Sequence, residues 1–199
     1  MSISYPLSLP SVSGIRGIEL RAVNAVAYSQ SPFTFAGQAH AYPGQMWQAD
    51  ITLPAMAAQN AEQWVAFLLA LRGRFGTFLL GDPSRTSLRG TATAASITGS
   101  AGDNTVSATV TAGQTLLAGD YIQLGSASTA TLHKVLVNYT GTGSAADLEI
   151  WPALRVNRTA ATATISDARG VFRLTSNEQS WSINEARIYG ISFSAMEAI

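Results

Sequence analysis

The distribution of aromatic residues along the chain is the feature that most restricts how it can fold. Segments 1–84 and 169–199 contain all but three of the Phe, Tyr and Trp residues, whereas the stretch between them is built largely from Ala, Thr, Gly and Ser. A tail that resumes the style of the head is typical of one domain interrupted by another, because the termini of a domain often lie close together. We therefore predict a discontinuous domain over 1–85 and 169–199, with an inserted domain over 86–168.

The composition favours a packed protein whose surface is partly covered by other proteins. Hydrophobic residues make up 47% of the 199 positions, which is ample for packed cores. Charged residues make up only 12%, against about 25% in typical globular chains. The net charge is zero, so no electrostatic footprint for nucleic acid is present. All basic residues except Lys134 are Arg, which suits protein interfaces, although GC-rich codon usage would also explain this bias.

Several classes of protein are disfavoured by what the sequence lacks. There is no Cys, which excludes disulfides and thiolate metal sites. The first residues have neither a basic stretch nor an apolar core, so we expect no signal peptide. No run approaches the roughly 18 apolar residues of a membrane span. We expect a chain that folds in a cytoplasm and does not enter a membrane.

The head segment predicts an arm, strands and one helix. Residues 1–14 are rich in Ser and Pro and predict an extended arm, and residues 18–21 alternate as a strand. Residues 47–53 place four apolar side chains on one face, the pattern of a half-buried strand. These four are Trp47, Ala49, Ile51 and Leu53.

A helix is predicted over 60–72, followed by a short strand over 77–80. Asn60 would cap the helix, Glu62 would lie in its first turn, and Gly73 would end it. One apolar stripe would face a sheet. The stripe comprises Trp64, Phe67, Leu68 and Leu71, widened by Val65 and Leu69.

The middle segment predicts many short strands with turns between them. Five strands over about 80 residues fit a small β-barrel, with an OB-like barrel among the candidates. After Gly170 the aromatic alternation returns and predicts strands that complete the first domain. The five predicted strands lie near 106–110, 121–124, 132–139, 148–151 and 163–165.

No arrangement of residues predicts catalysis, a cofactor or a metal. His40 and His133 lack the spacing of a metal pair and are interpreted as surface or interface residues. Residues 141–146 match the loose dinucleotide pattern G-x-G-x-x-A, but no helical stripe follows them, so a hairpin loop is favoured. Asp147 and Glu149 would share one strand face, but nothing predicts the cleft that a glycosidase needs. We therefore expect no enzyme, no cofactor and no metal.

The candidate contact residues are arginines and the few aromatics of the middle segment. The arginines are interpreted as subunit or domain-junction contacts, because a nucleic-acid face would need more charge and interleaved aromatics. They are Arg72, Arg74, Arg155, Arg158, Arg169 and Arg173. The candidate barrel-face aromatics are Tyr121, Tyr139 and Trp151.

Several passages together resemble the distal tail (Dit) proteins of long-tailed, non-contractile bacteriophages, the siphophages. The helix-then-strand passage 64–83 is similar to the corresponding passage of that family. Passages 118–122 and 148–155 resemble parts of its inserted domain, and 189–198 resembles its closing strand. The resemblance spans most of the chain as short islands and contains no catalytic signature.

The resemblance implies a structural virion protein of the tail tip, or baseplate, assembled in the bacterial host cytoplasm. The discontinuous domain would share the tail-tube fold, a β-sandwich with one flanking helix, and would form a homohexameric ring. The inserted domain would be an OB-like barrel. The ring would join the tail-tube protein above to the hub, and to tape-measure protein, below. DNA would pass through the lumen without specific binding, and no membrane would be involved.

Three alternatives stay open at this stage. A carbohydrate- or host-surface-binding module would use an exposed aromatic face on the OB-like barrel. A tail-tube or tail-terminator subunit would assemble differently, as filaments or as a terminal ring. A glycosidase or peptidase that uses Asp147 or Glu149 is the most remote alternative.

Overall fold

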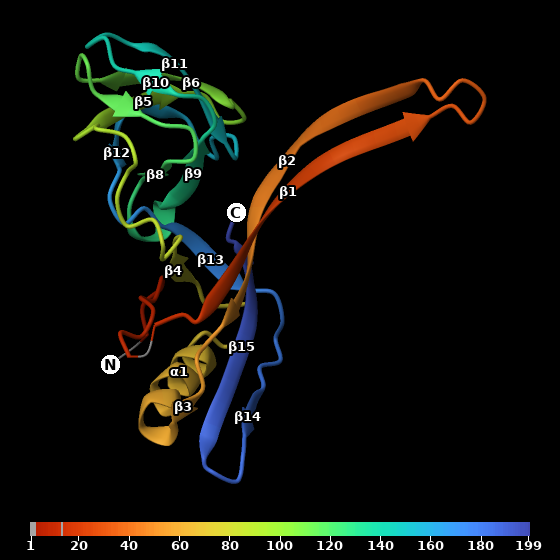
Figure 1. Ribbon diagram of the computed structural model, residues 1–199, viewed down its shortest axis with the longest axis vertical. Coiled ribbons are helices and arrows are strands. Elements are labelled where there is room, and N and C mark those ends of the chain that lie inside the picture. Colours follow the sequence, from red (N-terminus) through yellow and green to blue (C-terminus); the bar gives the residue numbers. More distant parts are fainter. Residues whose placement is uncertain (1–2, 13) are drawn as a thin grey trace.

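The computed structural model describes residues 3–12 and 14–199 and shows a mainly β protein, as predicted. A twisted sheet, a closed barrel and a long two-stranded ribbon that projects from both make up the molecule (Figure 1). Within the described range, no helix is long and apolar enough to cross a membrane. Residues 1, 2 and 13 of the predicted arm lie outside the described residues.

The sheet combines strands from the two ends of the chain. Its order is β1-β2-β15-β13-β4, and β3 and β14 also pair with β15. The C-terminal half of β15 pairs with β2 and β13, whereas its N-terminal half pairs with β3 and β14. The strands are β1 (Gly17–Gln30), β2 (Gly37–Thr52), β3 (Met56–Ala57), β4 (Phe78–Leu80), β13 (Gly170–Leu174), β14 (Trp181–Ile183) and β15 (Ile188–Glu197).

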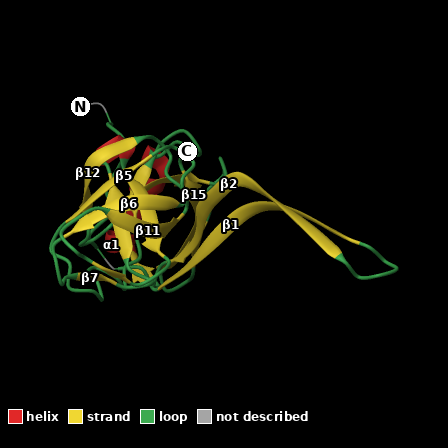
Figure 2. Ribbon diagram, turned by 90° about the horizontal axis from the view of Figure 1, so that it is seen from above, coloured by secondary structure: helices red, strands yellow, loops and turns green. Residues whose placement is uncertain are grey.

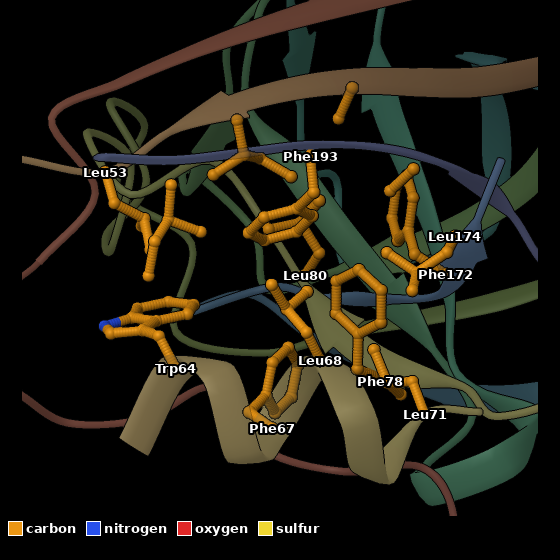
Figure 3. Close-up of a cluster of buried hydrophobic side chains, with 14 of the residues drawn as sticks. Leu53, Trp64, Phe67, Leu68, Leu71, Phe78, Leu80, Phe172, Leu174 and Phe193 are labelled. Carbon is orange, nitrogen blue, oxygen red and sulfur yellow. The ribbon is translucent and has the colours of Figure 1, made fainter. Parts of the chain in front are cut away.

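One hydrophobic core joins the head of the chain to its tail. Side chains of the helix α1 (Ala58–Ala70) point onto the sheet and meet aromatic rings from β4, β13 and β15 (Figure 3). The ring centroids of Trp64 and Phe193 are 6.3 Å apart, and those of Phe67 and Phe78 are 5.6 Å apart. The predicted face of residues 47–53 is buried, as its alternation indicated.

The helix differs from its prediction at its N-terminus. It begins at Ala58 and is capped by Ala57 without a side-chain hydrogen bond, so Asn60 lies inside the helix and is not its cap. Glu62 also lies beyond the first turn, where its carboxylate accepts a hydrogen bond from the Tyr189 hydroxyl at 3.1 Å. The predicted stripe is buried, but Leu69 is 59% exposed, because it lies on the outer face of the helix.

The described part of the predicted arm lies against the helix and the edge of the sheet. The N–H of Leu7 donates to Thr77, and the carbonyl of Leu7 accepts from Leu79. The Tyr5 hydroxyl donates to the carbonyl of Ala70 at 2.6 Å. These contacts fix the segment 3–9 in place beside β4.

The middle of the chain forms a closed barrel of six strands in the order β11-β6-β5-β12-β8-β9. The prediction lacked β5, and the predicted strand 132–139 is two strands, because the chain turns after β9 to pair with β7. The barrel strands are β5 (Ala95–Gly99), β6 (Thr105–Val110), β8 (Tyr121–Leu124), β9 (Thr131–Val135), β11 (Ala146–Trp151) and β12 (Arg158–Thr164). A two-stranded pair, β7 (Thr115–Leu116) and β10 (Tyr139–Thr140), and a 3-10 turn, η1 (Ala127–Thr129), accompany it.

Candidate assembly interface

The two longest strands continue far beyond the sheet as a projecting ribbon (Figure 2). β1 and β2 pair from Gly17 and Thr52 out to Gln30 and Gly37, with a bulge where Ala25 faces additional residues of β2. Bulges bend and twist a strand pair, and here the bulge stands where the ribbon leaves the body. Residues 25–44 are all exposed except the half-buried Ser31. We call residues 25–44 the free ribbon.

The free ribbon carries apolar side chains and no formal charge. No Asp, Glu, Lys or Arg occurs between Arg21 and Asp50. The exposed apolar residues of the free ribbon are Val26, Tyr28, Phe33, Phe35 and Tyr42. An uncharged, unpaired strand edge is a template for pairing with another chain, and natural proteins normally protect such edges with charges. An isolated two-stranded ribbon is also only marginally stable in water. The free ribbon is therefore an exposed, uncharged strand pair whose edges carry no charged side chain to protect them.

The tip of the free ribbon is a closed hydrogen-bonded turn. The N–H of Ser31 donates to Ala36, and the N–H of Phe35 donates to the carbonyl of Ser31, both at 2.9 Å. The side chain of Gln30 donates to the carbonyl of Phe35 at 2.9 Å. Phe35 has φ of 57°, an uncommon conformation for a bulky residue. The turn holds Phe33 and Phe35 outward, at 91% and 74% exposure.

The barrel anchors the ribbon immediately before the bulge. The indole N–H of Trp151 donates to the side-chain oxygen of Asn24 at 2.7 Å. Across the ribbon, the carboxamide oxygen of Gln45 accepts from the backbone of Ala153 at 2.8 Å and from the amide of Asn104 at 3.1 Å. Asn24 and Gln45 are paired residues of the two strands. The ribbon is therefore held on both strands at one level and is free beyond it.

A buried ion pair completes this junction. Arg155 donates to both carboxylate oxygens of Glu197, at 3.0 and 2.6 Å, and to the carbonyl of Gln45 at 2.6 Å. The same carboxylate accepts from the backbone N–H of Trp47 at 3.1 Å. The Glu197 side chain is 4% exposed and that of Arg155 is 14% exposed. Arg155 thus connects the barrel, β2 and β15.

Of the remaining predicted arginines, Arg158 lines the same pocket as Arg155, and the others lie elsewhere. Arg158 donates to backbone carbonyls of the barrel, and Arg169 pairs with Asp167. Arg72 and Arg74 are exposed beyond the end of α1, and Arg173 is half-buried on β13.

Two of the three candidate barrel-face aromatics are buried. Tyr139 is 6% exposed, and its hydroxyl donates to the carbonyl of Ala108 at 2.7 Å. Tyr121 is also 6% exposed and packs beside Trp47 of the sheet. The half-buried Trp151 meets Trp47 edge to face, with ring centroids 4.5 Å apart. Tyr121 and Trp151 therefore lie at the joint between barrel and sheet, and Tyr139 lies in the barrel core.

The two histidines have opposite environments. His40 is exposed on the free ribbon beside Tyr42. His133 is completely buried, which corrects its interpretation as a surface or interface residue. Its Nδ1 lies 2.7 Å from the carbonyl of Pro152, and its Nε2 lies 2.9 Å from the hydroxyl of Thr131. Burial lowers the pKa of His133 from 6.5 to about 4, with smaller contributions from nearby arginines.

The other candidates for chemistry lie in a connection between strands and on a strand of the barrel. Residues 141–145 connect β10 to β11, Ala146 begins β11, and no helix follows in the described part of the chain. Asp147 and Glu149 lie on β11, and the carboxylate of Glu149 accepts from the hydroxyl of Thr105. Across residues 3–12 and 14–199, no group of His, Asp and Glu is arranged to hold a metal ion.

The free ribbon and most of its anchors were missed from the sequence. The signal was present as a stretch without charge from 22 to 49. No local sequence pattern marks Asn104, Gln45 or Glu197, because their roles depend on contacts between distant segments. No protein-family model matches the chain, and no curated protein sequence is similar to it at a significant level.

Proposed function

We propose that this chain is a structural subunit of a phage tail tip, a distal tail protein whose copies form a ring of six between the tail tube and the hub. The observation that carries the proposal is the free ribbon, an exposed and uncharged β-ribbon on a body that is otherwise well packed. A ribbon of this kind supports a permanent assembly better than a solitary protein.

The junction supports this proposal physically. In a closed ring, every copy must present the same surface at the same angle to its neighbour, because head-to-tail contacts close only at a fixed rotation. The ion pair of Arg155 with Glu197 and the anchors at Asn24 and Gln45 hold the ribbon base against the barrel. A fixed ribbon direction is what a ring subunit requires.

The proposal includes a fold class for the sheet and another for the barrel. We assign the sheet and α1 to a tail-tube-like β-sandwich, in which β15 pairs with different strands along its two halves. We assign the barrel to an OB-like class, although it closes with six strands where the OB-fold has five.

The glycan-binding alternative receives less support from these residues. A glycan-binding barrel would need exposed aromatic rings, and Tyr121 and Tyr139 are buried. A tail-tube or tail-terminator subunit would use the ribbon equally well and differs in how the rings stack.

Native mass spectrometry and negative-stain microscopy of the purified chain test the proposal. We expect a species of six copies of the 20.9 kDa chain, seen as single closed rings. Filaments or stacked rings would indicate a tube subunit. A chain that stays monomeric at micromolar concentrations, alone and with tail-tube and hub proteins, would contradict the proposal. A variant with residues 26–41 replaced by a short turn serves as the control, and we expect it to stay monomeric and folded.

A further inference from the structure

An apolar groove lies at the base of the ribbon, around the bulge. Its volume is about 480 Å³, and its walls come from both ribbon strands, the barrel and the last described residue. The main lining residues are Val23, Pro43, Met46, Arg155 and Ile199. The Arg155 guanidinium is already paired with Glu197 and Gln45, so it adds no free charge to the groove.

The same chain carries a matching apolar projection at the ribbon tip. Phe33 and Phe35 are the two most exposed aromatic residues of the free ribbon. The turn beneath them is fixed by the hydrogen bonds of Ser31 and Gln30. A preorganised turn lowers the entropy cost of binding, and buried aromatic anchors dominate the energy of protein interfaces.

The tip cannot reach the groove of its own chain. An unbroken ladder from Val26–Ala41 to Gln30–Gly37 separates the bulge from the tip turn. At about 3.4 Å per residue this ladder holds the tip more than about 13 Å beyond the bulge. A ribbon tip that enters such a groove must therefore belong to another copy of the chain.

We propose that the Phe33–Phe35 tip of one copy inserts into the ribbon-base groove of the next copy. Tip and groove are different surfaces of one chain, so the contact is head to tail, the class that closes into rings. This inference rests on the proposed ring, because it names the two surfaces through which neighbouring copies would touch. Burial of two phenyl rings against Val23, Pro43 and Met46 would also cover the apolar area that both surfaces now expose.

Cysteine cross-linking tests the contact without background, because the chain contains no Cys. Phe33→Cys and Val23→Cys variants are mixed in equal amounts and oxidised, and the covalent dimer is measured on non-reducing gels. The joined peptides are then identified by mass spectrometry. We expect this pair to cross-link about tenfold faster than a matched pair of Phe33→Cys with Val137→Cys, because docking raises the effective concentration of the thiols. Val137 is a suitable control because it is 57% exposed on the barrel side of the molecule.

The outcomes separate this contact from the ring itself. A chain carrying both Phe33→Cys and Val23→Cys should give a covalent ladder that ends at the size of the ring. Rings that form without a preferred Phe33–Val23 cross-link would overturn the tip-in-groove contact and leave the ring standing. Faster cross-linking of Phe33→Cys with itself would show a tip-to-tip contact and would also overturn it. Monomers without cross-links would overturn both proposals.

Discussion

The barrel and the free ribbon share small, uncharged side chains, but the free ribbon also carries four aromatic residues, and only the barrel closes its strand edges. Both are antiparallel, poor in charge and rich in small side chains. The barrel pairs its strands in a closed circle around a buried interior that includes Ile97, Ile122 and Leu148. The free ribbon pairs each strand on one side only and buries almost nothing. Closed strand edges, more than composition, therefore allow the barrel to bury its interior within one chain. The open edges of the free ribbon leave it without a core of its own.

The largest expected contrast is between a barrel-interior residue and a ribbon residue. Ile122 is fully buried, whereas Val26 is 55% exposed. We expect Ile122→Ala to lower the free energy of unfolding by about 4 kcal/mol, because it leaves a cavity. Val26→Ala should change it by less than about 0.5 kcal/mol. Denaturant unfolding of the dilute chain measures both, and equal losses would refute the distinction between the two regions.

A substitution at the joint between the barrel and the ribbon should have the next largest effect on the free energy of unfolding. Arg155→Gln leaves Glu197 buried without its counter-ion, so we expect a loss of about 3–4 kcal/mol in unfolding free energy. Arg21→Gln is the matched control, because the Arg21–Asp50 pair is exposed and should contribute less than about 1 kcal/mol. Hydrogen exchange around Gln45 should become faster only in Arg155→Gln. Equal effects of the two substitutions would mean that the buried pair does not hold the joint.

The two histidines give a pH test of the same comparison. The pKa of His133 is about 4 in the folded chain and about 6.5 when unfolded, so the unfolded chain binds more protons between these values. Stability is therefore complete above pH 6.5 and falls by about 3 kcal/mol as the pH decreases toward 4. We expect His133→Gln to flatten unfolding free energy against pH in this window, and His40→Gln on the exposed free ribbon serves as the control substitution. A His133→Gln curve parallel to that of the parent would contradict the assignment.

The substitution with the smallest expected effect on folding stability should abolish assembly completely. Val26→Lys places a charge on the ribbon edge, which disfavours edge pairing, and it should change unfolding of the monomer by less than about 0.5 kcal/mol. Val137→Lys, on a barrel-side residue of nearly equal exposure, is the control. Mass photometry should show monomers for Val26→Lys and the parental assembly for Val137→Lys. Persistence of the assembly in Val26→Lys would remove the ribbon from the interface.

The elements that could be predicted from the sequence are those whose pattern arises from residues close together along the chain. The alternation from Trp47 to Leu53 and the stripe from Trp64 to Leu71 gave the mainly β class and the one helix, because burial follows the strand and helix periods. The strand β5 was missed, since its residues Ala95–Gly99 include only one large apolar side chain. The proposed boundaries near 85 and 169 stay a prediction.

The free ribbon could not be predicted in the same way. The free ribbon shows no inward and outward face, because neither face meets a core within this chain. Its strands therefore lack the period-2 burial signal, and only the missing charge marks them. The junction joins Arg155 to Glu197, 42 residues away, and to Gln45, 110 residues away, and local patterns do not connect such distant residues.

The position of β15 in the sheet has a consequence for how the protein is made. This strand lies between β2 and β13, yet the ribosome synthesises it after every strand of the barrel. The barrel can close before β15 is available to pair with β2, since domains tend to fold as units in the order of their synthesis. During that interval the nascent head of the chain is the part that chaperones would need to shield.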